Sequence, residues 1–289
     1  MKKQAFMRLS NPKFIIVFLL LWALLLVASP YAFFDLVNYS LFSFLGTMGA
    51  IFANSTGAGG GVVFIPMFTK LNFTEQQAIA TSFAIQCFGM TAGAVTWWHH
   101  YKTEKTDLRL WQGFKRIICV TSVASILGLY LVFSLQLDSP ASLHVSFSWF
   151  SLLLGFFIIL TIYLLKPHRE RSQLHIIDYL IIIAIGGLGG AVTAWLSVGV
   201  GELLVIYLLL RHFDMSMAVA AAVVVSAISV WSAIFHVESQ VYWQVVLFAG
   251  PGAVLGGVFA KTLVTHLSAI KLKLFFSCWL LISGAVGLI

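Results

Sequence analysis

Two glycine-rich interruptions of apolar stretches hold the groups in this sequence that could do chemistry. The first reads NSTGAGGG at residues 54–61, and the second reads SVGVGE at residues 197–202. Each is followed by an apolar stretch that predicts a short helix. The first amides of a helix lack an intrahelical acceptor and carry the positive end of the helix dipole, so they bind anions without arginine or lysine. Because glycine lets a ligand approach the backbone closely, both interruptions predict an anion site built from amides.

Small polar residues near the interruptions add hydrogen-bonding groups. With the glycines, they form the candidate substrate-binding set: Ser55, Thr56, Gly57, Gly59, Gly60, Gly61, Thr81, Ser82, Gln86, Ser197, Gly199, Gly201 and Ser226, with Asn54 beside them. Two plainer explanations stay open. Serine and threonine hydroxyls often bond to their own helix, and helical glycines often serve only close packing. For GAGGG we favour a site, because five small residues in a row exceed what packing needs.

Other kinds of site are not indicated. Cys87, Cys119 and Cys278 stand singly inside apolar segments, and no cluster of His or Cys has the spacing of a metal site. GAGGGV lacks the Lys-Ser/Thr pair of a phosphate loop, and hydrolase motifs are missing. The net charge of +7 is spread between apolar runs rather than over one folded face. We therefore expect no enzyme activity, no cofactor, no metal and no nucleic-acid partner.

Composition places these interruptions in a membrane protein. The chain has 289 residues, of which 60% are hydrophobic and 9% charged, with a mean hydropathy of +0.98, whereas soluble domains carry roughly 25% charged residues. Several apolar runs reach the roughly 20 residues that cross a bilayer. Pro30 follows the best signal-peptide cleavage candidates, Ala28 and Ser29, and the apolar run continues past them, so we expect an uncleaved first helix. The predicted fold class is an all-α, polytopic transmembrane helical bundle in a lipid bilayer.

Two apolar runs are too long for one crossing. The runs lie at about 14–34, 39–70, 77–98, 110–134, 145–165, 176–211, 216–237, 243–264 and 270–289. The long ones, 39–70 and 176–211, each contain one glycine-rich interruption. Each is therefore either one broken crossing or a hairpin that enters and leaves on the same side.

Lysine and arginine decide between these topologies, because cytoplasmic loops carry an excess of both. With two hairpins and a cytoplasmic N-terminus, every lysine and arginine except Lys70 falls on the cytoplasmic side. With two single crossings, the basic residues divide almost evenly between the sides. We therefore predict two glycine-broken hairpins in an inner-membrane protein whose N-terminus is cytoplasmic and whose C-terminus is outside.

This topology makes the two halves inverted repeats. The predicted parts are residues 1–38 (cytoplasmic N-terminus and first transmembrane helix), 39–165 (repeat 1), 166–175 (cytoplasmic linker) and 176–289 (repeat 2). Each repeat begins with its hairpin and continues with three helices. One constant offset along the chain places Phe73 on Phe213, and it also places Gly59 and Gly61 on Gly199 and Gly201. Inverted repeats with broken helices are typical of secondary transporters, whose site lies near the bilayer midplane.

Glu202 is the one acidic residue deep within a predicted span, and ionisable residues inside a membrane are functional candidates. Two roles are open. As a proton-coupling residue, it would carry a proton or repel an anion until protonated. As a structural residue, it would cap the amides of the helix that begins there.

The interruptions also carry a family resemblance. The first copy reads TGAGGGVVFIP and ends at Pro66, and ATSFAI follows at residues 80–85. This pattern resembles the TauE/SafE family of sulfite and organosulfur-anion exporters, which has a GxGGG break followed by proline and then a Thr-Ser motif. The second copy, SVGVGELLVIY, departs from the pattern with fewer glycines, no proline, and alanines where Thr81 and Ser82 stand in the first half. The likeness covers most of residues 39–289 and implies anion transport without fixing the cargo.

The sequence thus predicts a secondary transporter, of exporter type, for a small anion such as sulfite or an organosulfonate, held by facing half-helix N-termini in a water-filled cavity. A non-transporting membrane scaffold or assembly factor is the alternative from another class, and a transporter of a different solute, such as a carboxylate, is a further one. Cargo, direction, coupling ion and oligomeric state, a homo-oligomer included, are left open.

Overall fold

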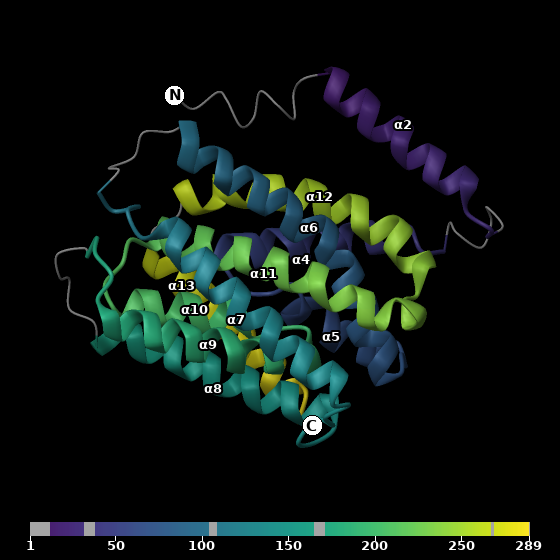
Figure 1. The fold of residues 1–289 in the computed structure, drawn as a ribbon. Coiled ribbons are helices and arrows are strands. Elements are labelled where there is room, and N and C mark those ends of the chain that lie inside the picture. Colours follow the sequence, from purple (N-terminus) through teal and green to yellow (C-terminus); the bar gives the residue numbers. More distant parts are fainter. Residues whose placement is uncertain (1–11, 32–37, 104–108, 165–170, 267–268, 289) are drawn as a thin grey trace.

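The computed structural model describes residues 12–31, 38–103, 109–164, 171–266 and 269–288. Within these ranges the chain forms eleven α-helices and one turn of 3-10 helix, with no β-strand. The all-helical class is therefore confirmed (Figure 1). Part of the predicted cytoplasmic N-terminus and half of the predicted linker at 166–175 lie outside the described residues.

Six described helices are long and apolar enough to cross a membrane: α6 to α9, α11 and α12. The helices are α2 (Pro12–Ala28), α4 (Phe42–Thr56), α5 (Gly61–Lys70), α6 (Glu75–Thr103), α7 (Phe114–Ser134), α8 (Leu143–Leu164), α9 (Ile176–Leu196), α10 (Val200–Leu210), α11 (Met215–Val237), η1 (Glu238–Gln240), α12 (Trp243–His266) and α13 (Ala269–Val286). Both glycine-rich interruptions separate two helices, α4 from α5 and α9 from α10. We call the end of the bundle where α6 begins end A, and the end where α6 finishes end B.

The first long run is a hairpin with its base at end A. Phe42 in the first turn of α4 and Phe68 near the end of α5 lie with their ring centroids 6.4 Å apart. Phe68 also stacks on Phe73, which immediately precedes α6, at 4.9 Å. The hydroxyls of Tyr39, before α4, and Tyr242, before α12, are 3.0 Å apart. The chain therefore enters and leaves this hairpin at one end of the bundle.

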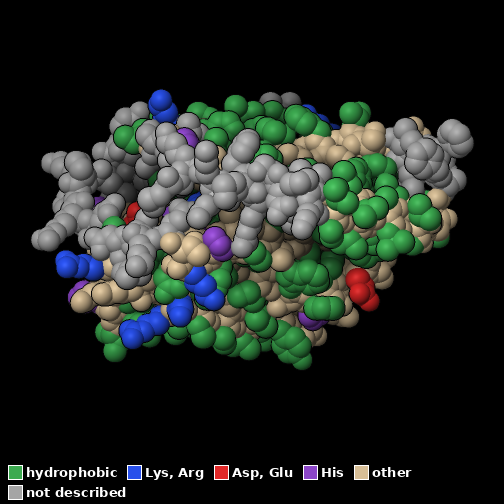
Figure 2. All heavy atoms as spheres, turned by 90° about the horizontal axis from the view of Figure 1, so that it is seen from above, with side chains coloured by type: hydrophobic (Ala, Val, Ile, Leu, Met, Phe, Trp, Pro, Cys, Tyr) green, Lys and Arg blue, Asp and Glu red, His purple; other side chains and the backbone are tan. Residues whose placement is uncertain are grey.

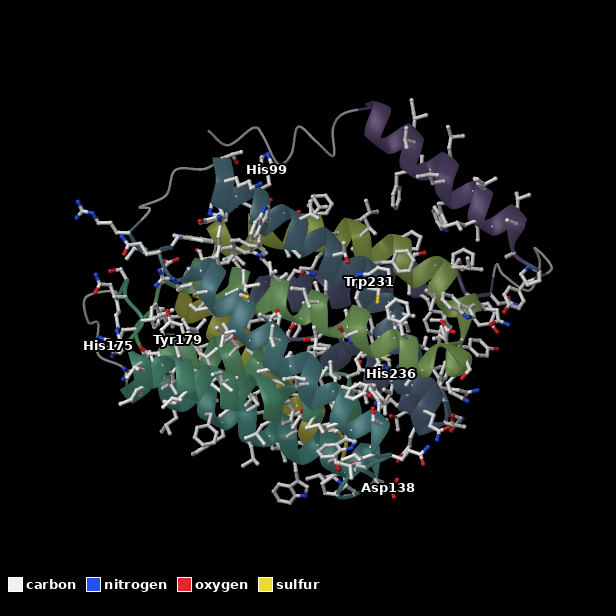
Figure 3. All side chains as sticks on the ribbon, viewed as in Figure 1. His99, Asp138, His175, Tyr179, Trp231 and His236 are labelled. Carbon is white, nitrogen blue, oxygen red and sulfur yellow. The ribbon has the colours of Figure 1, made fainter. Side chains whose placement is uncertain are left out.

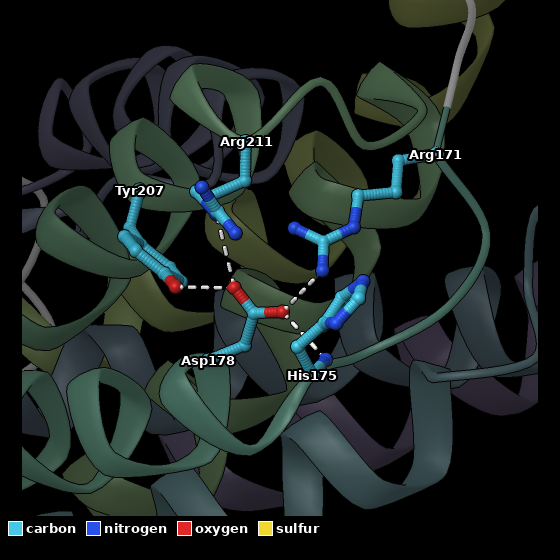
Figure 4. A network of polar contacts seen from close by, with 5 residues as sticks. All are labelled: Arg171, His175, Asp178, Tyr207 and Arg211. Carbon is cyan, nitrogen blue, oxygen red and sulfur yellow. Dashed lines mark hydrogen bonds and ion pairs between the residues drawn. The ribbon is translucent and has the colours of Figure 1, made fainter.

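The second long run is also a hairpin, and a buried carboxylate ties its base together (Figure 4). Asp178 in the first turn of α9 accepts hydrogen bonds from the Tyr207 hydroxyl near the end of α10 at 2.6 Å and from Arg211 Nε at 3.0 Å. Its other oxygen accepts from Arg171 Nη2 at 2.8 Å and from the backbone amide of His175 at 2.7 Å. The start of α9 and the end of α10 are thus held side by side.

This second base lies at end B. Tyr101, in the last turn of α6, stacks on Trp111 with a centroid distance of 5.8 Å. Gly113, two residues further on, lies against the side chain of Leu174, just before α9. The two hairpins therefore open toward opposite ends of the bundle, as the distribution of lysine and arginine predicts.

Backbone conformation repeats at the offset that relates the two halves of the sequence. Gly57 and Ser197 end α4 and α9 with left-handed φ angles of 82° and 59°, and Asn72 and His212 follow α5 and α10 with φ angles of 59° and 61°. α6 and α11 begin at residues 75 and 215. The local geometry of the two hairpins is thus matched, and the inverted symmetry of the complete halves stays a prediction.

The exterior suits a bilayer. Large apolar side chains face outward on many helices, among them Leu41, Val27 and Ile176, each at least 80% exposed. In Figure 2, green apolar side chains cover much of the face, and most of its blue lysines and arginines gather toward one end. His99 and His175 lie at that end, whereas Asp138 and His236 lie at the opposite end (Figure 3). Together with the six apolar helices, this surface shows an integral membrane protein.

The Asp178 network predicts a large stability effect. Replacing Asp178 by asparagine is expected to lower the free energy of unfolding by about 2–3 kcal/mol, because a buried charged acceptor is lost while both guanidinium groups keep their charge. Thermal unfolding in detergent measures the change. Tyr207→Phe is the matched control, which removes one bond to the same carboxylate and should cost about 1 kcal/mol. Wild-type stability of Asp178→Asn would show that the network does not hold the hairpin closed.

Candidate functional site

The two helix breaks lie directly against each other. A Cβ built on Gly61, the first residue of α5, would come within 2.6 Å of the Ser197 carbonyl oxygen in the other break. A Cβ built on Gly201 in α10 would overlap the Gly57 carbonyl oxygen. Real Cβ atoms essentially never approach within 3.0 Å of another heavy atom. The contacts are reciprocal between the two halves, so glycine is required here because two backbones meet, and not only because a turn is tight.

Backbone geometry explains why each helix stops where it does. Gly57 adopts a left-handed conformation, and its amide bonds to the Ala53 carbonyl at 2.9 Å, which is the usual way a helix ends at glycine. Ser197 ends α9 in the same conformation, with its amide 2.8 Å from the Thr193 carbonyl oxygen. Gly199 has a φ of 148°, a value that side chains disfavour. Each break therefore reverses the chain and starts a new helix whose first amides point toward the other break.

Glu202 joins the two breaks through its carboxylate. Its Oε1 accepts a hydrogen bond from the amide of Gly59 at 2.7 Å, and its Oε2 accepts one from the amide of Gly199 at 2.8 Å. The side chain is 0% exposed, and it forms no ion pair with any described residue. A buried charge without a cation is costly unless charge-assisted hydrogen bonds and dipoles compensate it. Here the compensation comes from the start of α5 and the start of α10 together.

Gln86 on α6 makes a second connection between the breaks. Its Oε1 accepts from the amide of Gly60 at 2.7 Å. Its Nε2 donates to Ser197 Oγ at 2.8 Å and lies 3.1 Å from both the Ser197 carbonyl oxygen and Ser82 Oγ. Ser197 Oγ in turn donates to Ser82 Oγ at 2.9 Å. The amides of Gly59, Gly60 and Gly199 thus have side-chain acceptors from elsewhere in the cluster.

Ser226 is the one predicted hydroxyl that faces the breaks without a partner. Its Oγ is buried and has no hydrogen-bond partner among the described residues. It lies so close to Gly201 that a Cβ there would overlap it. Ser226 also corresponds to Gln86 when the two halves are aligned, and it stands on the equivalent helix of the second half. An unsatisfied buried hydroxyl costs about 1–3 kcal/mol, so its position beside the break favours a partner that is bound in another state.

Three other predicted residues use their side chains elsewhere, and Thr56 does so in part. The hydroxyls of Ser55 and Thr56 donate to the Phe52 carbonyl at 3.1 and 2.8 Å, which is the plainer role that we left open for them. The Thr56 hydroxyl oxygen also accepts from the amide of Ala58, inside the first break, at 3.3 Å. Thr81 accepts from the amide of Tyr242 at 3.0 Å, toward end A. Asn54 donates to carbonyls of its own helix and of α6, and its Oδ1 has no partner among the described residues. Their part in substrate binding stays a prediction.

The breaks are closed in this conformation. Glu202, Gln86, Ser82 and Ser197 are all between 0% and 2% exposed. Gln86, Ser82 and Ser197 bond to one another, and Glu202 bonds to the amides of the breaks. The water-filled cavity that we expected at the amides is therefore filled by protein side chains. A ligand can reach these amides only after the side-chain acceptors move away.

A comparison with protein families identifies the class of protein that carries this arrangement. The family model described as Sulfite exporter TauE/SafE matches residues 42–286, a range that contains both hairpins and Glu202. The chain belongs to the TauE/SafE family. This member is therefore a membrane transport protein of the sulfite-exporter type, and its family is one of transporters rather than enzymes. No curated protein and no solved structure matches the chain.

Sequence reasoning missed the Asp178 network of this TauE/SafE member. The signal was present, because the predicted hairpin brings residues 176 and 211 to the same side of the membrane. Asp178 and Arg211 then stand at matching depths, and Arg171 precedes them in the cytoplasmic linker. Two arginines beside one acid at a hairpin base predict an ion-pair cluster. These residues hold the hairpin and do not contact the breaks.

Proposed function

We propose that this protein is a secondary transporter that exports a small anion, of the sulfite or organosulfonate class, bound between the first amides of α5 and α10. One observation carries the proposal: a single carboxylate already accepts hydrogen bonds from Gly59 at 2.7 Å and from Gly199 at 2.8 Å. A carboxylate and a sulfur oxyanion both present negatively charged oxygen acceptors. The pair of half-helix N-termini therefore has the chemistry of an anion receptor.

In this proposal Glu202 occupies the receptor until cargo replaces it. An ionised carboxylate accepts on both oxygens, whereas a protonated one turns one oxygen into a donor that would face an amide N–H. Protonation of Glu202 therefore weakens its hold on one break and releases an amide for the anion. Glu202 accepts from the amides of Gly59 and Gly199 and forms no ion pair with any described residue, so no cation among those residues holds the carboxylate in place. Proton coupling through Glu202 follows from this exchange of occupants.

A second cargo class is favoured by the same observation. Because the group bound at the amides is itself a carboxylate, a small carboxylate solute fits them as well as a sulfur oxyanion does. A non-transporting scaffold fits less well, because a buried carboxylate and an unpartnered hydroxyl at the breaks add nothing to a purely structural role. The proposed orientation has a cytoplasmic N-terminus in the inner membrane, so that end B faces the cytoplasm.

Reconstitution of the full chain into liposomes tests the function. Sulfite, sulfate, thiosulfate, simple sulfonates and small carboxylates are loaded and followed with and without a pH gradient. At least one of these anions is expected to cross at least ~tenfold faster than in protein-free liposomes. If none of them moves faster than in protein-free liposomes, under either condition, anion transport by this chain is refuted.

A further inference from the structure

A hollow of about 450 Å³ opens at end A between α6, α7, α9 and α11. Polar side chains line much of it, including Gln136, Asp138, Ser139 and His236. Asp138 and His236 lie at the same end of the molecule in Figure 3. Its polar lining would hold water, which distinguishes it from a lipid-filled groove.

Residues that line this hollow lie one helical turn along α6 from the break cluster. Glu75 and Ile79 of α6 line the hollow, and Ser82 and Gln86 belong to the cluster. With ~3.6 residues per turn and a rise of ~1.5 Å per residue, these four residues form one stripe along α6, and Ile79 stands only ~5 Å before Ser82. The helix face that lines the hollow therefore continues directly into the candidate site.

α9 reaches the site from the same hollow. Ala194 and Trp195 line it, and Ser197, two residues further on, bonds to Gln86 and Ser82. The Trp195 indole donates to the Leu137 carbonyl at 2.8 Å and so fastens the tip of α9 to the turn after α7. Toward end B, the second half of the molecule is closed by fully buried apolar side chains, among them Leu208 and Met217. The hollow thus offers a way from the breaks to water at end A.

The charges of the hollow disfavour the binding of an anion within it. Glu75 and Asp138 are acidic, and among the described residues that line the hollow there is no lysine or arginine. Glu75 accepts a hydrogen bond from the Leu143 amide at 2.9 Å, so its carboxylate is held in place. An anion that enters this space meets polar groups that solvate it and carboxylates that repel it, so it does not stay bound.

We propose that this hollow is the release vestibule of the transport route, through which a small sulfur oxyanion leaves the breaks toward end A when the tip of α9 moves. The inference rests on the proposed function and adds the route. Ile79 of α6 and Ala194 of α9, which line the hollow, border the route. The hydrogen bond between Trp195 and Leu137 keeps the route closed.

Cysteine labelling tests this route in the full chain. Cys87, Cys119 and Cys278 are first replaced by Ala, Ser and Ser, and then Ile79→Cys or Ala194→Cys is introduced. The probe is the negatively charged 2-sulfonatoethyl methanethiosulfonate, supplied on both sides of the proteoliposomes so that protein orientation does not matter. Ala80→Cys is the matched control, because Ala80 has the same depth on α6 but is 0% exposed in the core. Mass spectrometry measures labelling, and sulfite flux is recorded before and after.

The expected result is complete labelling at position 79, slower labelling at position 194, where the native side chain is only 4% exposed, no labelling at position 80, and loss of sulfite flux in the two labelled variants. Absence of labelling at both positions would overturn the vestibule, because the hollow would not be open to water. Full labelling with unchanged flux would show that the hollow is open to water but is not part of the transport route. If the unlabelled Cys-free parent and the wild type both fail to move any tested anion, the proposed function is refuted, and the route that depends on it is refuted as well.

Discussion

Replacing Gly201 by alanine is expected to reduce anion flux by about 100-fold, because the added Cβ would overlap the Gly57 carbonyl oxygen and Ser226 Oγ. The carbonyl belongs to the backbone of the other break and cannot rotate away, so the two breaks must separate. Overpacking of this kind costs ~1–3 kcal/mol, and 3 kcal/mol in a transport barrier corresponds to about 100-fold in rate. Proteoliposome flux of sulfite, or of whichever panel anion the wild type moves, measures the effect.

Gly187→Ala supplies the matched control. A Cβ at Gly187 would meet nothing within 4 Å, although this glycine also lies in an apolar helix of the second half. It should transport like the wild type. The double variant Gly201→Ala with Ser226→Gly removes one of the two overlaps and should recover little flux, because the backbone overlap remains. Wild-type flux in Gly201→Ala would show that close contact of the breaks is not needed for transport.

Replacing Glu202 by glutamine is expected to abolish the pH dependence of transport. The glutamine side chain does not ionise, so its charge does not change with pH. Its single acceptor oxygen can serve only one of the two amides that Glu202 joins. For one proton per anion, a gradient of one pH unit is worth ~1.4 kcal/mol and changes accumulation about tenfold. The variant should lose this response while still exchanging labelled for unlabelled anion at equal pH. In the same proteoliposomes, anion accumulation under a pH gradient measures the pH response, and exchange of labelled anion at equal pH measures transport without a gradient.

Glu238→Gln is the control for this experiment. Glu238 is an exposed acid in η1 at end A that has no contact with the breaks, so its replacement should leave the pH response intact. Loss of both accumulation and exchange in Glu202→Gln would assign Glu202 a structural role as a cap. An unchanged pH response would remove Glu202 from proton coupling and leave the amides as the anion site.

The breaks combine features that stability alone disfavours. Where the two backbones meet, a buried carboxylate has no cation and a buried hydroxyl has no hydrogen-bond partner among the residues that the structure describes. Natural proteins keep such groups where function needs them, and the remaining helices supply the stability that this arrangement costs. The hairpin bases show the opposite design, since Asp178 at end B has four hydrogen-bond donors around it. The base of the second hairpin is thus held by charged hydrogen bonds, whereas the breaks are arranged so that their partners can be exchanged.

Several features of this protein were determined by the sequence alone. Composition set the membrane class, because 9% charged residues cannot cover a soluble surface of this size. The uneven placement of lysine and arginine predicted that both long runs are hairpins. Helix lengths could not have done so, since α9, with 21 residues, is long enough to cross a membrane by itself. Glycine spacing located both breaks, because only glycine permits such close backbone contact.

Tertiary structure alone decided which groups meet at the breaks. Glu202 and Gly59 are 143 residues apart in the chain, and Gln86 and Ser197 are 111 apart. Periodicity and local propensity describe neighbours within a few turns and cannot say which distant side chain satisfies a given amide. For the same reason, Thr81 and Ser82 were indistinguishable in sequence, although one faces Tyr242 and the other the breaks. A rotation of about 100° per residue along α6 separates their roles, and only packing fixes which face turns inward.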